Sequence, residues 1–108
     1  MGRAEEAAKE GRMVQYIVLA KFTDQGIRAV KDTPKRARAF RETAKAMGVT
    51  IKEIYWTLGQ YDVVLTMEAP QDGAVASLMF KVGSLGNLTS QTLRAFSEAE
   101  IEAIVAKV

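Results

Sequence analysis

Two apolar runs separated by a glycine step constrain the fold of this chain more than any other feature. The runs are residues 49–58 and 61–69, and Gly59-Gln60 lies between them. Glycine adopts positive φ at no steric cost, and a Gly-X pair suits the type II′ turn of a two-residue hairpin. The sequence therefore predicts two neighbouring antiparallel strands joined at Gly59-Gln60.

Residues 13–23 alternate as a strand does, but they are apolar on both faces. One face carries Val14, Tyr16, Val18, Ala20 and Phe22, and the other carries Ile17 and Leu19. Residues 61–69 are likewise apolar on both faces, because Val64 alternates with Val63 and Leu65. Apolar side chains on both faces of a strand indicate burial on both sides.

Residues 24–48 are predicted to be helical in two pieces. Asp24 is a candidate cap for a short first helix, and Thr33-Pro34 supplies an N-cap and a proline at N1 for the second. Gly48 fits the left-handed stop. The outer face of the second piece is basic, with Lys35, Arg36, Arg38, Arg41 and Lys45. This face is either a solvated surface or a surface for phosphate or an acidic partner.

The second half of the chain repeats the order of helix and strand. Asp72 opens a helix whose apolar stripe is Val75, Leu78, Met79 and Val82. Residues 88–96 are predicted to form the fourth strand. Ser97 and Glu100 match a capping box, which begins a short last helix. Its apolar side chains are expected to face inward: Ile101, Ile104 and Val105.

The resulting order is β-α-β-β-α-β followed by a helix, over residues 13–108. This order predicts an α+β fold, a ferredoxin-like sandwich with a four-stranded antiparallel sheet and both main helices on one face. The second apolar face of the sheet would then be a large exposed patch. We therefore expect self-association, sheet against sheet, in a homo-oligomer.

Composition excludes several kinds of site. The 108 residues make one domain, and they include no His and no Cys. The usual zinc sites, a Ser-His-Asp triad and an imidazole haem ligand are therefore excluded, and no metal or cofactor is predicted. The absence of Cys fits a cytoplasmic location. No apolar run is long enough for a membrane helix, and a net charge of +2 is too small to favour nucleic acid.

Residues 1–12 lack an apolar face and are interpreted as an N-terminal extension of the domain. No apolar segment follows their charges, so they do not match a signal peptide. Met13 is a candidate natural start. An added tag or an engineered segment is therefore an open alternative to a natural extension.

Several stretches of the chain resemble the GYD domain family: residues 56–62, 83–87, 91–96, 22–27 and 31–36. The family is named for the Gly, Tyr and Asp that match Gly59, Tyr61 and Asp62. The resemblance implies a dimeric α/β-barrel of ferredoxin-like subunits and a bacterial or archaeal source. It implies no activity, because the family is essentially uncharacterised. The Gly-X-Tyr-Asp turn is also similar to that of effector-binding domains in Lrp/AsnC-type regulators.

The hairpin gathers most of the candidate site residues. A ligand, if there is one, is expected beside the turn, bound by Tyr55, Trp56, Gly59, Tyr61, Asp62, Ser84 and Asn87. Each has a structural alternative. The rings would also suit a sheet edge or subunit seam. Asp62 would also suit backbone capping, and residues 83–87 would also suit a helix stop.

Three classes of function fit these residues. The first, which we favour, is a homo-oligomeric small-ligand-binding or regulatory module without catalysis. The second is a cofactor-free enzyme, in which Asp62, Tyr61 or a lysine would serve as the base. The third is a structural or assembly subunit, either natural or re-engineered, which the unusual start of the chain and Met79-Phe80 favour. A second protein component is a candidate partner besides a second copy of the chain and a small molecule.

Overall fold

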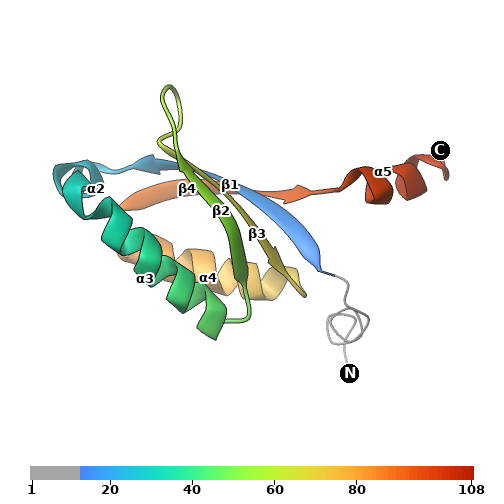
Figure 1. Cartoon of the computed structure of the whole chain (residues 1–108), viewed down its shortest axis with the longest axis horizontal. Helices are drawn as coiled ribbons and strands as arrows, with labels where there is room; N and C mark the ends of the chain where they lie inside the picture. Colours follow the sequence, from blue (N-terminus) through green and yellow to red (C-terminus); the bar gives the residue numbers. More distant parts are fainter. Residues whose placement is uncertain (1–12) are drawn as a thin grey trace.

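The computed structural model describes residues 13–108, and its elements follow the predicted order (Figure 1). The strands are β1 (Val14–Phe22), β2 (Thr50–Trp56), β3 (Val63–Ala69) and β4 (Leu88–Ala95). The helices are α2 (Asp24–Arg28), α3 (Thr33–Ala46), α4 (Asp72–Ser84) and α5 (Glu98–Val105), with a short 3-10 helix, η1, at Val30–Asp32. The predicted N-terminal extension, residues 1–12, lies outside the described residues.

The four strands form one antiparallel sheet in the order β2-β3-β1-β4. The helices α3 and α4 each connect two strands and lie on the same side of this sheet (Figure 1). The connection through α3 takes the chain from β1 past β3 to β2, and the connection through α4 takes it from β3 past β1 to β4. Strands β1 and β3 therefore lie in the centre of the sheet. The predicted ferredoxin-like fold is confirmed.

The hairpin between β2 and β3 is centred where the sequence predicts it. Trp56 pairs with Val63, and that register places Gly59-Gln60 at the middle of the turn. Gly59 has a φ of +103°, in the positive-φ region that favours glycine. The predicted two-residue turn is not formed, because residues 58–61 lie between the last backbone-bonded positions of the hairpin, Thr57 and Asp62. The strands are shorter than predicted, because regular pairing ends at Trp56 and one further bond joins Thr57 N to Asp62 O at 2.9 Å. The remaining loop projects past the end of the sheet (Figure 1).

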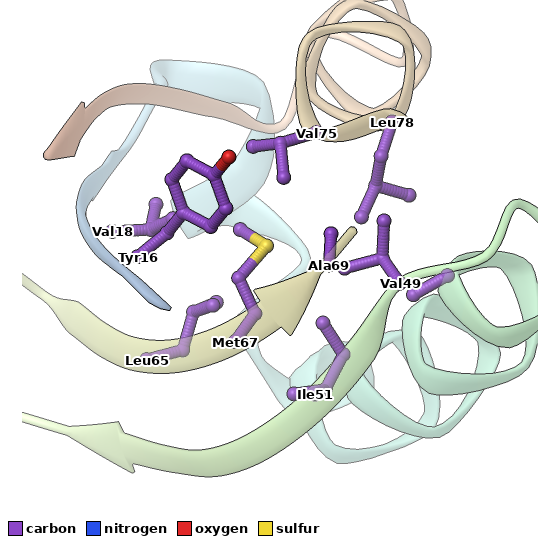
Figure 2. Packing of buried hydrophobic residues seen from close by; sticks show 10 residues of the cluster. Tyr16, Val18, Val49, Ile51, Leu65, Met67, Ala69, Val75 and Leu78 are labelled. Atoms are coloured by element: carbon purple, nitrogen blue, oxygen red, sulfur yellow. The ribbon is translucent and has the colours of Figure 1, made fainter. Parts of the chain in front are cut away.

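The core lies between the helix-covered face of the sheet and the helices. Figure 2 shows Tyr16 and Val18 of β1 and Met67 of β3 on one side of it, with Leu78 of α4 on the other. Val18, Met67 and Leu78 have no exposed surface. Along β1 and β3, buried side chains alternate with more exposed ones, as the sequence pattern indicates, because successive side chains of a strand point to opposite faces.

The opposite side of the sheet carries a band of apolar side chains that no described part of the chain covers. We call it the helix-free face: Ile17, Leu19, Tyr55, Val64 and Leu93. Strand pairing sets these residues side by side, because Leu19 and Tyr55 both pair with Val64, and Ile17 pairs with Leu93. Ile17, Leu93 and Tyr55 are 36%, 43% and 56% exposed. The predicted second apolar face is therefore present, and it is open in the single chain.

Two predicted helix caps differ from the observed ones. Thr23, not Asp24, caps α2, because its hydroxyl accepts a bond from Gly26 N at 3.1 Å. Thr33 begins α3 as its first residue, and Asp32 stands in the cap position without a side-chain bond. The short 3-10 helix η1 runs directly into α3, so Thr33 already has helical backbone angles and cannot act as the extended N-cap.

The last helix corrects a further prediction. The capping box of Ser97 and Glu100 is present at the start of α5. However, Ile101, Ile104 and Val105 are 42–55% exposed and do not face inward. The chain leaves the edge strand β4 at Ala95 and carries α5 beyond the end of the sheet (Figure 1), so no core surface formed by residues 13–108 lies opposite its apolar stripe.

Candidate functional site

A cleft of about 310 Å³ lies between α3, α4 and the helix-covered face of the sheet. We call it the α3–α4 cleft. Val18 and Leu65 line it from the strands, Phe40 lines it from α3, and Met79 and Val82 line it from α4. These apolar side chains give the interior of the cleft the character of a site for an apolar molecule.

The cleft stays open because small residues face it from both helices. Ala37 and Ala39 of α3 and Gly83 of α4 all line it. Larger side chains at these positions would occupy the space that protein interiors normally fill. The small side chains of α3 and α4 therefore leave a hollow where the two helices pack on the sheet.

Trp56 and Thr33 join the strand side of the cleft to the start of α3. The indole Nε1 of Trp56 donates to Thr33 Oγ1 at 3.0 Å, and both residues line the cleft. Trp56 is 46% exposed, so its ring is both a wall of the cleft and accessible from solvent. We expect the signal of an indole in this position to change when a molecule enters the cleft.

Asn87, also a lining residue, lies in a bonded junction between the loop after α4 and the start of α2. Its carbonyl accepts from Thr23 N at 3.1 Å, and its side-chain oxygen accepts from Gln25 Nε2 at 2.9 Å. Gly26 makes this junction possible, because a Cβ there would overlap the Asn87 carbonyl. The sequence analysis missed this role of Gly26, for which the only local signal is a glycine inside a short helix.

The other predicted site residues do not line the cleft. Asp62 holds the hairpin to β1, since its Oδ2 accepts from Phe22 N at 2.9 Å and its backbone N–H donates to Ala20 O at 2.8 Å. The ring of Tyr61 has Lys21 Nζ at 5.6 Å from its centroid. The carboxylate of Asp62 thus has a structural task at the turn.

Tyr55, Gly59 and Ser84 also lie away from the cleft. The hydroxyl of Tyr55 donates to Glu53 Oε2 at 2.5 Å, and that bond raises the pKa of Tyr55 above its ordinary value. Gly59 is exposed at the tip of the hairpin. Ser84 Oγ donates to Lys81 O at 2.6 Å within α4. The structure therefore brings Trp56 and Asn87 together at the cleft and leaves the other five predicted residues outside it.

A model of the GYD domain family matches residues 16–105, which include both main helices, three complete strands and β1 from its third residue. The chain belongs to the GYD domain family. The Asp that helps to give the family its name is here the residue that fastens the hairpin to β1.

Two known proteins are similar to this GYD domain. The "Glutamine synthetase and cystathionine beta-lyase binding protein" of Thermus thermophilus is 33% identical over 90 residues, which cover 82% of this chain and 95% of that protein. The crystal structure of MtbAldR superposes with a TM-score of 0.52 at 14% identity. That alignment covers 82% of this chain and 57% of the MtbAldR chain, and at this identity it supports the ferredoxin-like fold alone.

A second, shallower cleft of about 270 Å³ in the GYD domain contains a buried tyrosine. The hydroxyl of Tyr16 donates to Asp72 Oδ1, and Arg94 lines the same cleft. Burial is the main cause that raises the pKa of Tyr16, and the hydrogen bond and charge of Asp72 add to it. In the sequence, Tyr16 lies on one apolar face of a predicted strand and Asp72 lies at a predicted helix start, and no local signal connects the two.

The described part of the GYD domain lacks two other kinds of feature. Among residues 13–108, no helix is long and apolar enough to cross a membrane. No group of three acidic side chains in the same residues is placed to hold a metal ion. The α3–α4 cleft is the candidate site within these residues.

Proposed function

We propose that this GYD domain is a homo-oligomeric regulatory module that binds a small, mainly apolar molecule in the α3–α4 cleft. The observation that carries the proposal is the cleft itself, about 310 Å³ in volume and bordered by apolar side chains from the sheet and both helices. Ligand sites in proteins are commonly concave, apolar and largely preformed, with a few polar groups that fix orientation. In this proposal Trp56 and Asn87 contact the ligand.

Native mass spectrometry of the protein purified from its own host tests this proposal. We expect a bound small molecule on the wild type and its loss in Ala37→Phe, because the larger side chain enters the cleft. Ala46→Phe is the matched control, since Ala46 is exposed on the same helix and does not line the cleft. A wild type without bound mass, or a bound mass that Ala37→Phe retains, would contradict the proposal.

The helix-free face supports the homo-oligomeric part of the proposal. It presents Ile17, Leu93 and Tyr55 to solvent in the single chain, next to half-buried Leu19 and Val64. A contiguous apolar face on a soluble domain is better buried against another surface than left in water. A second copy of the chain would offer the same face, and the two would pack sheet against sheet.

A second candidate function is the binding of another protein through α5. Its apolar stripe is exposed, and the helix lies beyond the sheet, away from the cleft (Figure 1). The relative from Thermus thermophilus is named for binding two enzymes, which favours a protein partner here as well. An amphipathic helix of this kind can place its apolar side chains in a groove of a partner.

Binding to glutamine synthetase from the same host, measured by surface plasmon resonance, tests this second candidate. We expect the wild type to bind, Ile104→Glu to bind at least about tenfold more weakly, and Ala103→Glu to bind as the wild type does. Ala103 is the matched control because it is exposed on α5 outside the apolar stripe. Equal binding by both variants, or none by the wild type, would remove α5 from this role.

A further inference from the structure

The charges around the α3–α4 cleft indicate which class of molecule it receives. Of the side chains that line the cleft, two are ionised, Arg36 of α3 and Lys81 of α4, and both are cationic. Among residues 13–108, no Asp or Glu lines the cleft. The cleft thus combines an apolar interior with ionised side chains that are all positively charged.

The two cations come from opposite helices. Arg36 is half-buried, and Lys81 is exposed, so their charged ends are available near solvent while the strand side chains lie deeper. Within residues 13–108, the ion pairs join Lys52 to Glu68 and Arg94 to Glu100, and neither includes Arg36 or Lys81. Both cations can therefore attract an anionic group without first releasing an acidic partner among the described residues.

The outer face of α3 carries charge of the same sign, which speeds the approach of an anion but does not contact its head in the cleft. Arg38 and Lys45 are exposed on the same helix, and Glu42 is the one acid within α3. A surface with an excess of one charge raises the local concentration of the opposite charge. The guanidinium of Arg36 also has the planar geometry that binds an oxyanion through two hydrogen bonds.

We propose that the ligand of the α3–α4 cleft is an amphipathic oxyanion: an apolar chain or ring system that ends in a carboxylate or a similar anionic head. This inference rests on the proposed function, because it names the ligand class of the same cleft. The apolar body occupies the hollow beside Val18, Leu65 and Met79, and the head stays at the mouth beside Arg36 and Lys81. The head thereby avoids the large cost of burying a charge in an apolar interior.

Isothermal titration calorimetry with three probes of equal chain length tests the inference: decanoate and decyltrimethylammonium below their micellar concentrations, and decanol below its solubility limit. We expect decanoate to bind about tenfold or more tightly than decanol, since hydrogen bonds to charged groups are among the stronger ones. The cationic probe should bind most weakly.

Two double variants separate the cleft from the general charge of the surface. Arg36→Gln with Lys81→Gln should abolish the preference for decanoate over decanol. Arg38→Gln with Lys45→Gln removes the same formal charge from exposed positions outside the cleft and should keep the preference. Circular dichroism checks that both variants are folded.

The outcomes distinguish this inference from the function on which it rests. Equal affinity for all three probes, or an unchanged preference in the Arg36 and Lys81 double variant, would overturn the head-group assignment while the cleft remained a ligand site. Binding of none of the three probes would contradict both.

Discussion

The close approach of two backbone segments, at Gly26 and Asn87, shows how much of this fold depends on a single residue. Gly26 is buried, and a Cβ at this position would meet the backbone of Asn87. The junction also contains the bonds from Thr23 Oγ1 to Gly86 O at 2.6 Å and from Gln25 Nε2 to Leu85 O at 2.9 Å. It therefore fixes the loop that contributes Asn87 to the cleft.

We predict that Gly26→Ala lowers the free energy of unfolding by about 2 kcal/mol, because the added methyl forces backbone apart at a bonded contact. Gly73→Ala is the matched control. Gly73 is also helical, but nothing lies near the position of its Cβ, so the change should be neutral or slightly stabilising. Urea denaturation measures both variants, and equal stabilities would mean that the junction tolerates a side chain.

Tyr16 gives a prediction about pH. Its pKa is raised above the ordinary tyrosine value of about 10, mainly by burial, so the folded state favours the neutral hydroxyl. The stability that this neutral group contributes is fully present below about pH 10, and it is lost as the pH rises toward the raised pKa. Above about pH 10, the free energy of unfolding of the wild type should therefore fall relative to that of Tyr16→Phe. A difference that is constant from pH 8 to 11 would contradict this assignment.

At the scale of elements, the strands and main helices could be predicted because their signals are local. Alternation identifies β1 and β3, and Gly59 fixes the centre of the hairpin. The direction of α5 could not be predicted, because an apolar stripe shows which side of a helix avoids water but not what covers it. The pairing of Tyr16 with Asp72 required the tertiary arrangement, since 56 positions separate them.

The same limits apply to the candidate site. Trp56 and Asn87 were predicted together from ring chemistry and loop position, and both line the cleft. The hollow itself comes from Ala37, Ala39 and Gly83, which the sequence analysis did not connect with a ligand. Small residues on a helix carry no signal of an open space until the packing of the neighbouring helix is known.

Helix α5 contributes little to the stability of the single chain in this structure. We predict that replacing Ile101 and Ile104 with Ser changes the free energy of unfolding by less than about 0.5 kcal/mol, because both are exposed surface positions. Leu78→Ala, in the fully buried part of α4, should cost about 2–5 kcal/mol. Urea denaturation at low protein concentration compares them. A large loss in the Ile101 and Ile104 variant would show that α5 packs on a folded surface.

At the scale of the whole molecule, the apolar surfaces of this domain are divided between its two faces. The helix-covered face contains the core and the cleft, and the helix-free face presents its apolar band to solvent. Self-association through the helix-free face would leave the cleft accessible on the other side of the sheet. Oligomer formation and ligand binding are therefore compatible in one assembly.

We predict that light scattering gives a mass of at least two chains for the wild type at low micromolar concentration. Leu19→Glu should reduce it to one chain, because it introduces a charge into the middle of the helix-free face. Lys45→Glu changes charge on the exposed side of α3 and should leave the mass unchanged. A wild type that is monomeric, or a Leu19→Glu variant of unchanged mass, would show that this face is not the interface.

The most direct test of ligand binding in the α3–α4 cleft is a ¹H–¹⁵N spectrum recorded with and without decanoate. The chain has a single tryptophan, so the indole N–H of Trp56 gives one isolated signal at the edge of the cleft. We predict that this signal and the backbone amides of Ala37 and Asn87 move on titration, while those of Ile17 and Leu93 on the helix-free face do not. Shifts confined to Ile17 and Leu93, with an unchanged Trp56 signal, would contradict a ligand site between α3 and α4.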